Sequence, residues 1–289
     1  MKPMKNEIKT CRCPVCKGKQ PIYAELLEVD LYFCKNCRHR FTDPHSISSK
    51  EEYSQEYYDK KHRRWFENPD VRLFEFIYQQ IERLKPDASV LDVGCGNGAF
   101  LKYLRRRSTR LKLTGIDLSF NVQQEGIKFY QSDIFALKED SAFDVVVNLA
   151  VIEHIWELDA FIAKITRLCK SGGIITTMTV NDDGITYFAG RMALSLGKPF
   201  IADRLYEKHH VNHFSDKSLR NLFKNDCYSL LTSYLHSPAL AAIDTPGQNN
   251  FVRFLYLCGL TGVMALEKIA KKGMLQTLVV KKNDFLILI

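Results

Sequence analysis

The sequence predicts an α/β protein built on a mainly parallel sheet with helices on both faces, preceded by a small cysteine-rich N-terminal module. Two observations predict this class. From about residue 70 onward, short apolar segments alternate with segments of helical period, as in βαβ units. Before them, two Cys-x-x-Cys pairs are separated by 17 residues and lie outside that alternation. The 289 residues, 46% of them apolar, suffice for one large domain and an appendage.

The N-terminal module is expected to bind a metal ion. Two Cys-x-x-Cys pairs at this separation can bring four thiolates around one tetrahedral Zn²⁺, and the expected ligands are Cys13, Cys16, Cys34 and Cys37. Cys11 lies in a Cys-x-Cys register too short for such a turn and is interpreted as a spare thiol. Two disulfides are the competing interpretation. However, the opening residues MKPMKNEIKT lack the apolar core of a signal peptide, which favours a cytoplasmic location.

Three parts are expected along the chain: a zinc-ribbon domain at 1–45, a linker with a short helical approach at 46–69, and a second domain at 70–289. The second domain opens with a helix at 70–84, because DVRLFEFIYQQIERL repeats apolar residues at helical spacing and KPD then stops it. The residues expected on its packed stripe are Leu73, Phe76, Ile77, Gln80 and Leu84.

The remaining elements alternate along the second domain. Ser215 is the expected N-cap of a late helix, with Asp216 in its first turn. An insertion at about 236–273 is expected to carry its own amphipathic helix. The other predicted elements are, in order, strand 89–93, helix 100–107, strands 111–117, 127–133 and 143–150, helix 158–169, and strands 172–180, 227–235 and 275–282.

The segment VLDVGCGNGAF at 90–100 combines a strand, a glycine turn and a helix, which is the form of a nucleotide-binding loop. Gly94 and Gly96, with Cys95 between them, would let the backbone approach a ligand where a Cβ would collide. Gly98 would open the helix, whose first amides lack intrahelical partners. The pattern Gly-x-Gly-x-x-Ala also satisfies the dinucleotide fingerprint, so NAD is the alternative ligand.

Acidic residues at the ends of three successive strands favour a different ligand. Asp92 would repel a pyrophosphate but attract S-adenosylmethionine, which carries a sulfonium, an ammonium and no phosphate. Asp117 is placed to accept from both ribose hydroxyls. Asp133 is placed to accept from the adenine amino group, with Ile134 packing on the ring. The remaining expected cofactor contacts are Leu118 and Asn148.

Five segments resemble, in order and at ordinary intervals, the motifs of class I S-adenosylmethionine-dependent methyltransferases: LDVGCGNGAFL, GIDLS, QSDIF, FDVVVNLAVIEHI and LCKSGGIITTMTV. The resemblance covers roughly residues 70–235. It implies a Rossmann-like sheet of seven strands whose last strand is antiparallel, and the segment at 275–282 fits that strand.

The N-terminal module resembles the zinc ribbon that precedes this fold in a set of sugar and natural-product methyltransferases. In that set a phenylalanine-threonine-x-proline turn and a tyrosine-rich stretch follow, here at 41–44 and at Tyr53, Tyr57 and Tyr58. Two features depart from the pattern: no glycine follows Cys37, and the chain is too short for the extra C-terminal domain of the larger sugar C-methyltransferases. The resemblance implies a small-molecule acceptor, such as a sugar nucleotide or a glycan or secondary-metabolite precursor.

Methyl transfer from a sulfonium requires positioning and, for a hydroxyl acceptor, a base. The candidates are His154 in AVIEHI and both His210 and His213 in EKHHVNHF. A structural role, as a packed histidine or part of a helix cap, is the alternative for each. The fourth strand ends in NLAV rather than Asn-Pro-Pro-aromatic, which argues against methylation of the adenine amino group. The cysteines outside the ribbon lack the setting of a pyrimidine nucleophile.

Two other functions stay open at this point. The formal charge of +8 is concentrated in the N-terminal part, which is compatible with a ribosomal RNA base methyltransferase. The second open function is a zinc-bearing binding module that has no catalytic activity. Asp92, Asp117 and Asp133 argue against it, because cofactor binding would require all three. The apolar window at 251–266 contains Arg253 and is shorter than the ~20 residues of a membrane-spanning helix. A helix at 251–270 is expected to be a lid or a packing helix across the edge of the sheet, with weak contact to a membrane surface as the alternative.

Overall fold

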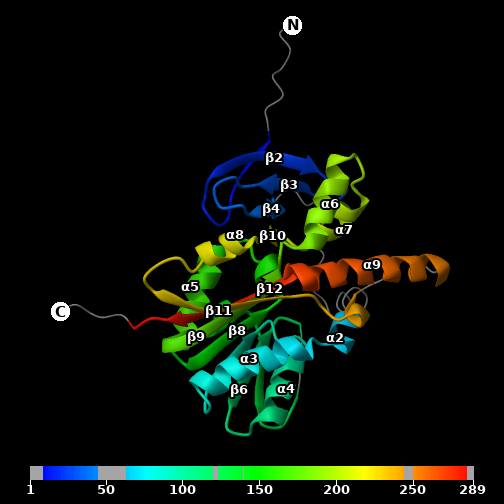
Figure 1. The fold of residues 1–289 in the computed structure, drawn as a ribbon. Coiled ribbons are helices and arrows are strands. Elements are labelled where there is room, and N and C mark those ends of the chain that lie inside the picture. Colours follow the sequence, from blue (N-terminus) through cyan, green and yellow to red (C-terminus); the bar gives the residue numbers. More distant parts are fainter. Residues whose placement is uncertain (1–8, 45–62, 120–122, 139, 244–249, 285–289) are drawn as a thin grey trace.

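The computed structural model describes residues 9–44, 63–119, 123–138, 140–243 and 250–284. Its larger sheet has seven strands in the order β11-β12-β9-β8-β5-β6-β7 (Figure 1). The pairs are parallel except those of β12, which runs antiparallel to both neighbours. The predicted α/β class and antiparallel last strand are therefore confirmed. The strands are β5 (Ser89–Val93), β6 (Lys112–Asp117), β7 (Ile127–Gln131), β8 (Phe143–Leu149), β9 (Cys169–Val180), β11 (Tyr228–His236) and β12 (Leu275–Lys282).

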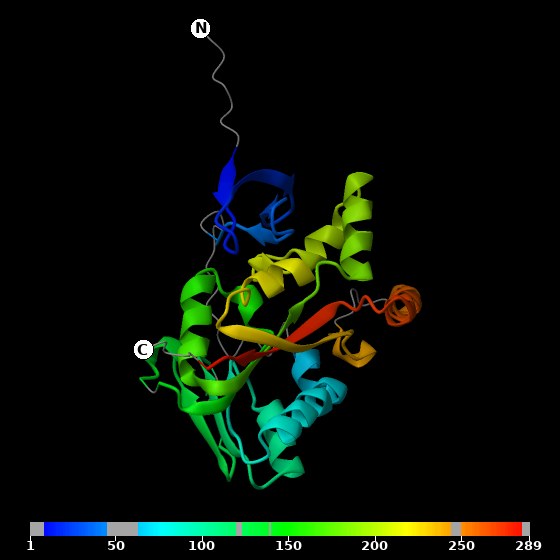
Figure 2. The ribbon, with the colours of Figure 1, turned by 60° about the vertical axis from the view of Figure 1, so that its left-hand side comes forward.

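Helices cover both faces of this sheet (Figures 1 and 2). Successive residues of a strand point to opposite faces. Strand β8 therefore contributes Val145 and Val147 to one core and Val146 to the other. The two cores give a three-layer fold with the sheet in the middle. The helices are α3 (Val71–Leu84) and α4 (Ala99–Arg107) over the first core, and α5 (Leu158–Leu168) and α8 (Asp216–Asn221) over the second.

The packed face of α3 is turned relative to the predicted stripe. Phe74 packs against Phe100 of α4, with ring centroids 5.2 Å apart, and this contact draws the helix toward that side. Phe76 instead stacks on Tyr234 of β11 at 4.8 Å. The prediction is wrong for Leu84, which is 41% exposed at the end of the helix. The buried residues of α3 are Leu73, Phe74, Ile77 and Ile81.

Two helices between β9 and the next strand are missed by the sequence analysis. They are α6 (Ile185–Ser195) and α7 (Phe200–Leu205), which lie side by side near the N-terminal module (Figure 1). Gly190 permits their close approach, because a Cβ there would lie 2.8 Å from Leu205 Cδ1. Within α6 the buried residues are Tyr187 and Gly190 alone, so its apolar pattern is too weak to reveal a helical period.

The predicted helix of the insertion is α9 (Asn250–Ala270), which packs against α6. Across the described ranges, no helix combines the length and apolar character that a membrane span requires. Ser215 caps α8 as predicted, because its Oγ accepts from the Ser218 amide at 3.1 Å. The short helices are α2 (Arg63–Glu67), η2 (Ile134–Ala136), η3 (Ile152–His154) and η4 (Leu240–Ala242).

The N-terminal module is a second sheet, with the order β1-β2-β3-β4-β10 (Figure 1, top). Its fifth strand, β10 (Asn212–His213), comes from the C-terminal half of the chain and pairs antiparallel with β4. Residues 45–62 of the expected linker, with Tyr53, Tyr57 and Tyr58, lie outside the described residues. The other strands are β1 (Thr10–Arg12), β2 (Lys19–Glu25), β3 (Asp30–Phe33) and β4 (Arg40–Thr42).

Candidate active site

The glycine loop joins β5 to α4 at the carboxyl edge of the large sheet. Gly94, Gly96 and Gly98 have φ values of +67°, +52° and +74°, which side chains other than glycine rarely adopt. A Cβ on Gly94 would lie 2.4 Å from Val151 Cγ2, and one on Gly96 would lie 2.7 Å from Phe66 Cε1. These three positions therefore accept only glycine. Gly96 and Gly98 are buried, whereas Gly94, Cys95 and Asn97 are partly exposed and line a cleft.

Asp117 holds this loop against the end of β6. Its carboxylate accepts from the Gly96 amide at 2.9 Å and from the Ser119 amide at 2.8 Å. Cys95, partly buried, packs on the other side of the loop, because a Cβ on Gly115 would lie 2.7 Å from its Sγ. Two predicted cofactor contacts, Asp117 and the glycine loop, thus lie together at one edge.

Asp92 lies behind the loop with 2% of its surface exposed. Its Oδ1 is buried without a hydrogen-bond partner in the part of the chain that the structure describes. Burial raises the pKa of this carboxyl well above its usual value, and the neighbouring Asp117 raises it further. A ligand that brings positive charge or donors to this edge would satisfy that oxygen. S-adenosylmethionine, with its ammonium and sulfonium, therefore fits the residues present.

A cleft that is partly open to solvent lies at this edge. Its walls come from the glycine loop, from α2 and from the ends of β8 and β9, and they include Asp92, Gly94, Asn97, Phe66, Leu149 and Met178. Phe66 was not predicted as a residue of this site. Its position as an aromatic residue shortly before the first helix of the domain could have indicated it.

The other predicted cofactor residues lie in different settings. Asp133 is exposed and caps η2, since its Oδ1 accepts from the Phe135 amide at 2.8 Å. Ile134 is buried in the second core, and Leu118 is 60% exposed. Asn148 is fully buried and donates to the Thr177 hydroxyl at 3.0 Å. The helix cap alone accounts for the position of Asp133, without a ligand. The amide of Asn148 already has a hydrogen-bond partner within the sheet.

The three predicted catalytic histidines lie near one another at the same edge. His154 ends η3, and its ring centroid is 4.8 Å from that of His210, which is in turn 6.2 Å from that of His213. His154 Nδ1 is 2.8 Å from the His209 carbonyl oxygen. A carbonyl can only accept, so Nδ1 carries the proton, and in the neutral ring Nε2 keeps its lone pair. His154 is therefore held in the tautomer that a general base requires.

His213 is the most enclosed of the three. It is fully buried, and neither ring nitrogen has a hydrogen-bond partner among the described residues. Burial lowers its pKa to about 3, so the ring is neutral at physiological pH. Its ring packs edge-on against Tyr206 at 4.7 Å. These contacts favour a packing role for His213 more than a catalytic one.

Glu153 joins this cluster from the buried side of η3. It is 2% exposed and accepts from the Thr179 hydroxyl at 2.9 Å, and burial raises its pKa to about 7. Side-chain atoms of Glu153, His154 and His210 that could ligate a cation all lie within 4.8 Å of one another. The cluster can therefore hold a proton or a cation.

The raised pKa of Glu153 predicts a pH-dependent stability. The protonated carboxyl is favoured in the folded state, so its contribution is fully present below the unfolded pKa near 4.5 and is lost as pH rises through about 7. In urea unfolding, Glu153→Gln should gain about 3 kcal/mol relative to the wild type between about pH 4 and pH 8. The exposed Glu28→Gln is the control. Stability curves of Glu153→Gln and wild type that stay parallel across this range would contradict the prediction.

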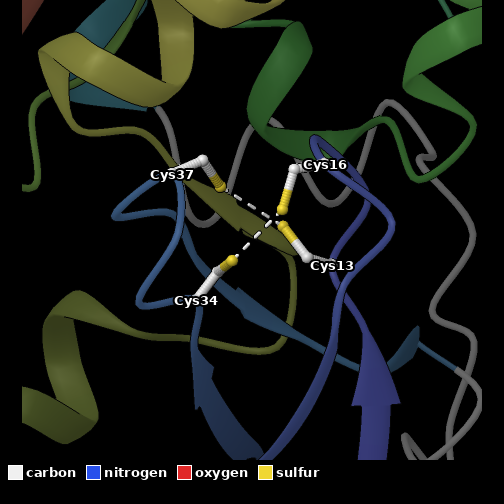
Figure 3. Close-up of side chains that lie close together, drawn as sticks. All are labelled: Cys13, Cys16, Cys34 and Cys37. Atoms are coloured by element: carbon white, nitrogen blue, oxygen red, sulfur yellow. Dashed lines mark hydrogen bonds between the residues drawn. The ribbon is translucent and has the colours of Figure 1, made fainter.

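The four predicted metal ligands converge in the N-terminal module (Figure 3). The Sγ atoms of Cys13 and Cys37 are 3.6 Å apart, and those of Cys16 and Cys34 are 3.3 Å apart. A disulfide would require about 2.05 Å, whereas tetrahedral ligands at the Zn–S distance lie about 3.8 Å apart. All nine cysteines are free, and Cys11 stays outside the group as predicted. The spacing therefore fits a tetrahedral metal site and excludes the two-disulfide interpretation.

The backbone of both cysteine turns has the same form. Lys17 and Arg38, each directly after the second cysteine of its pair, have φ values of +62° and +63°. Their amides donate to the carbonyls of Cys13 and Cys34 at 2.8 and 2.7 Å. The missing glycine after Cys37 is thus accommodated by Arg38 in the left-handed region.

Asp182 is a buried acid that the sequence analysis misses. It is fully buried, accepts from the Tyr206 hydroxyl at 2.7 Å and from Arg191 at 3.1 Å, and forms an ion pair with Arg40 of the N-terminal module. Asp182 follows the end of strand β9, and this position resembles those of Asp92 in β5 and Asp117 in β6. The resemblance could have indicated it from the sequence. The contact ties the module to the carboxyl edge of the large sheet.

Comparison with known proteins identifies the larger part of the chain. Residues 58–226 match a family model described as a methyltransferase domain. The ubiquinone biosynthesis O-methyltransferase of Rickettsia canadensis is 34% identical over 136 residues, which cover 43% of this chain and 56% of that protein. Its mitochondrial counterpart from Dictyostelium discoideum is 28% identical over 163 residues, covering 48% and 49%. The alignments thus span about half the length of these relatives.

Solved structures show the same fold. Coclaurine N-methyltransferase bound to N-methylheliamine and SAH matches with a TM-score of 0.52 and 13% identity, over 73% of this chain and 72% of that one. A chain from the complex between a Haloferax volcanii methyltransferase activator and a methyltransferase matches with a TM-score of 0.53 and 15% identity, over 81% and 99%. Because the family model spans more than half of the sequence, the chain belongs to the methyltransferase-domain family.

Proposed function

We propose that this methyltransferase acts on a hydroxyl oxygen of a small-molecule acceptor, with His154 as the general base. The hydrogen bond from His154 Nδ1 to the His209 carbonyl carries this proposal, because it places the proton on Nδ1 and the lone pair of the neutral ring on Nε2. Base catalysis of this kind contributes typically 10²–10⁴-fold to a rate. An oxygen acceptor needs such a base, since a hydroxyl must lose its proton as it attacks.

The proposal places the cofactor in the cleft at the glycine loop. The methionine portion would lie over Gly94, Cys95 and Gly96, with Asp92 near its positive charge. The ribose would lie at Asp117 and the adenine between Leu118, Asp133 and Ile134, with Gly98 and Asn148 at the margins. When bound, S-adenosylmethionine supplies a methyl carbon already activated by the sulfonium. The protein's part is to orient the acceptor, to exclude water and to take up the proton.

Replacement of Asp117 tests this placement. Asp117→Ala should weaken S-adenosylmethionine binding by on the order of 1–3 kcal/mol, the scale of a hydrogen bond to a charged group. Calorimetric titration measures this change, and thermal unfolding separates it from loosening of the glycine loop. Asp133→Ala, which removes an exposed cap, is the matched comparison and should have the smaller effect. Equal affinity of the Asp117→Ala and wild-type proteins would remove the ribose contact from the proposal.

The acceptor class rests on the relatives and on the histidine cluster. The curated relatives are named O-methyltransferases of ubiquinone biosynthesis, which supports an oxygen acceptor of low molecular weight. Their alignments cover about half of each protein, so the acceptor of this chain is a proposal of its own. The proposed class of acceptor includes sugar nucleotides and precursors of glycans or secondary metabolites.

The four-cysteine group is proposed to bind one structural Zn²⁺. Four protein ligands leave no open position, which is typical of structural rather than catalytic zinc. The hydrogen bond with Cys37 lowers the pKa of Cys13 to about 6, so one thiolate ligand forms readily at neutral pH. The proposal keeps the predicted division into a ribbon at 1–45, a linker at 46–69 and a methyltransferase domain at 70–289.

A labelling panel tests the acceptor class. The zinc-loaded protein is incubated with S-adenosylmethionine tritiated in its methyl group and, separately, with a simple catechol, UDP-glucose or ribosomal RNA. Label is expected in a small-molecule hydroxyl compound and not in RNA. Label in RNA alone would overturn the small-molecule proposal in favour of a ribosomal RNA methyltransferase. His154→Asn in parallel shows whether incorporation depends on the proposed base.

A further inference from the structure

Strand β10 belongs to both parts of the protein. Its residues Asn212 and His213 pair with Phe41 and Arg40 of β4, and the Thr42 amide donates to the Val211 carbonyl at 3.1 Å. The histidine-rich loop, residues 207–211, leads directly into this strand. The edge of the ribbon sheet therefore fixes the main chain of the loop that carries His209 and His210.

The side chain of Asn212 extends this connection to η3. Its Nδ2 donates to the Ile155 carbonyl at 2.6 Å and to the Ile152 carbonyl at 3.3 Å. Two carbonyls on that side fix the orientation of the amide, so Oδ1 faces His39 and accepts from its Nε2 at 2.9 Å. Asn212 and His39 are both fully buried. The hydrogen bonds to His39 and Ile152 are therefore shielded from competing water, and the one to Ile155 is partly buried.

The two ends of this connection are functionally distinct. Ile152 and Ile155 flank Glu153 and His154, so Asn212 holds both ends of the short turn that presents the proposed base. At the other end, His39 follows the second cysteine turn, and its carbonyl accepts from the Cys34 amide at 2.8 Å. The turn that closes around the metal thus sets the position of His39. Hydrogen bonds therefore connect Cys34, through His39 and Asn212, to the turn that carries the proposed base.

The cofactor side has a different support. The amides of Gly94 and Cys95 donate to the Ile116 carbonyl at 2.8 and 3.2 Å, and Gly96 donates to Asp117. The glycine loop is therefore anchored on β6, within the large sheet. If the ribbon lost its structure, η3 would therefore be displaced more than the glycine loop.

We propose that Asn212 is a positioning residue through which the four-cysteine ribbon holds His154 in the orientation for transfer, so that methyl transfer depends on the ribbon's metal while cofactor binding does not. The inference rests on the proposed function in taking His154 as the base. It assigns the ribbon a role in catalysis without any contact between the metal and the substrates. Displacements of about 1 Å at a catalytic group can lower a rate about 100-fold, which sets the scale of the expected effect.

The test uses the full-length, zinc-loaded protein with tritiated S-adenosylmethionine and either catechol or UDP-glucose, whichever takes up label. Asn212→Leu has a similar size but cannot donate, and its kcat should fall about 100-fold while the Kd for S-adenosylmethionine stays unchanged. His39→Leu should behave in the same way. His39→Gln, whose amide can still donate to Asn212, should restore transfer. Lys9→Ala removes a surface ion pair with Asp30 at 3.0 Å, away from the cysteine turns of the ribbon, and it should leave kcat unchanged.

A second readout is independent of the acceptor. Nitrogen NMR of protein labelled with nitrogen-15 histidine reports the tautomer of each ring, with His154 assigned by its loss in His154→Asn. The wild type should show the proton of His154 on Nδ1. Asn212→Leu and His39→Leu should lose this preference, and His39→Gln should keep it. Zinc content measured on each variant shows that the ribbon itself remains metal-bound.

The inference and the proposed function fail in different ways. If neither hydroxyl compound accepts label but the His154 tautomer still follows the Asn212 and His39 variants, the acceptor chemistry is wrong and the coupling stands. If kcat and tautomer in Asn212→Leu and His39→Leu both match the wild type, the coupling is overturned. Equal losses of cofactor binding and transfer would also overturn it, because they would show a general loss of structure.

Discussion

Cys34→Ser protein is expected to purify without zinc and with an unfolded ribbon. The four thiols lie at the spacing of a tetrahedral site, and three thiolates with a hydroxyl form a much weaker one. Structural zinc contributes on the order of 10–16 kcal/mol of folding free energy in zinc-finger peptides, and Cys13, Cys34 and Cys37 belong to the small core of the ribbon. Metal analysis and limited proteolysis of residues 9–44 measure the loss.

Cys11→Ser is the matched control for this variant. Cys11 lies in the same module but outside the four-cysteine group, and burial raises its pKa to about 11, which keeps it a thiol. It should retain about one zinc per chain, the number for a single four-ligand site. The large sheet should remain folded in both variants, because its two cores draw nearly all of their buried residues from outside the ribbon. A wild-type protein free of zinc, or a Cys34→Ser protein with full zinc, would contradict the assignment.

His154→Asn is expected to lower kcat by about 10²–10⁴-fold, the usual contribution of a general base. The asparagine amide can replace the Nδ1 donor to the His209 carbonyl, so the loop keeps its hydrogen bond while the Nε2 lone pair is lost. Steady-state kinetics and calorimetry should show a loss in kcat with no change in cofactor affinity. The variant therefore separates a chemical role of the ring from a structural one.

The same substitution distinguishes the two interpretations of this histidine. If His154 only anchors the loop, His154→Asn should retain nearly full transfer. The ring of His210 lies 4.8 Å from that of His154, and His210→Gln should have a smaller effect because the proposed base is His154. A larger loss in His210→Gln than in His154→Asn would transfer the role of base to His210.

Features governed by short stretches of sequence could be predicted. The strand, glycine turn and helix around Gly94 follow from local backbone needs and alternation, and the cysteine turns follow from ligand spacing. Asp92 and Asp117 share the carboxyl edge because parallel strands end there. Asp133 shows the limit of the same rule, since its place at a strand end is explained by a local cap.

Features governed by packing between distant segments could not be predicted. Asn212 and His39 are separated by 173 positions, and neither has a local pattern that marks it as a partner of the other. Helix α3 buries Phe74 because this residue packs against Phe100. Phe76 is equally apolar, so the sequence of α3 alone could not distinguish the two. Helices α6 and α7 bury few side chains and so lack the periodicity on which prediction depends.

The position of the transferred methyl group tests the central claim most directly. The zinc-loaded protein is incubated with S-adenosylmethionine labelled with carbon-13 in its methyl group, together with the small-molecule and RNA fractions of a cell extract. Carbon NMR and mass spectrometry then identify the labelled compound and the atom that bears the label. The account predicts a methyl group on oxygen in the small-molecule fraction, lost when His154 is replaced by asparagine. A methyl group on nitrogen or carbon, or label confined to RNA, would contradict it.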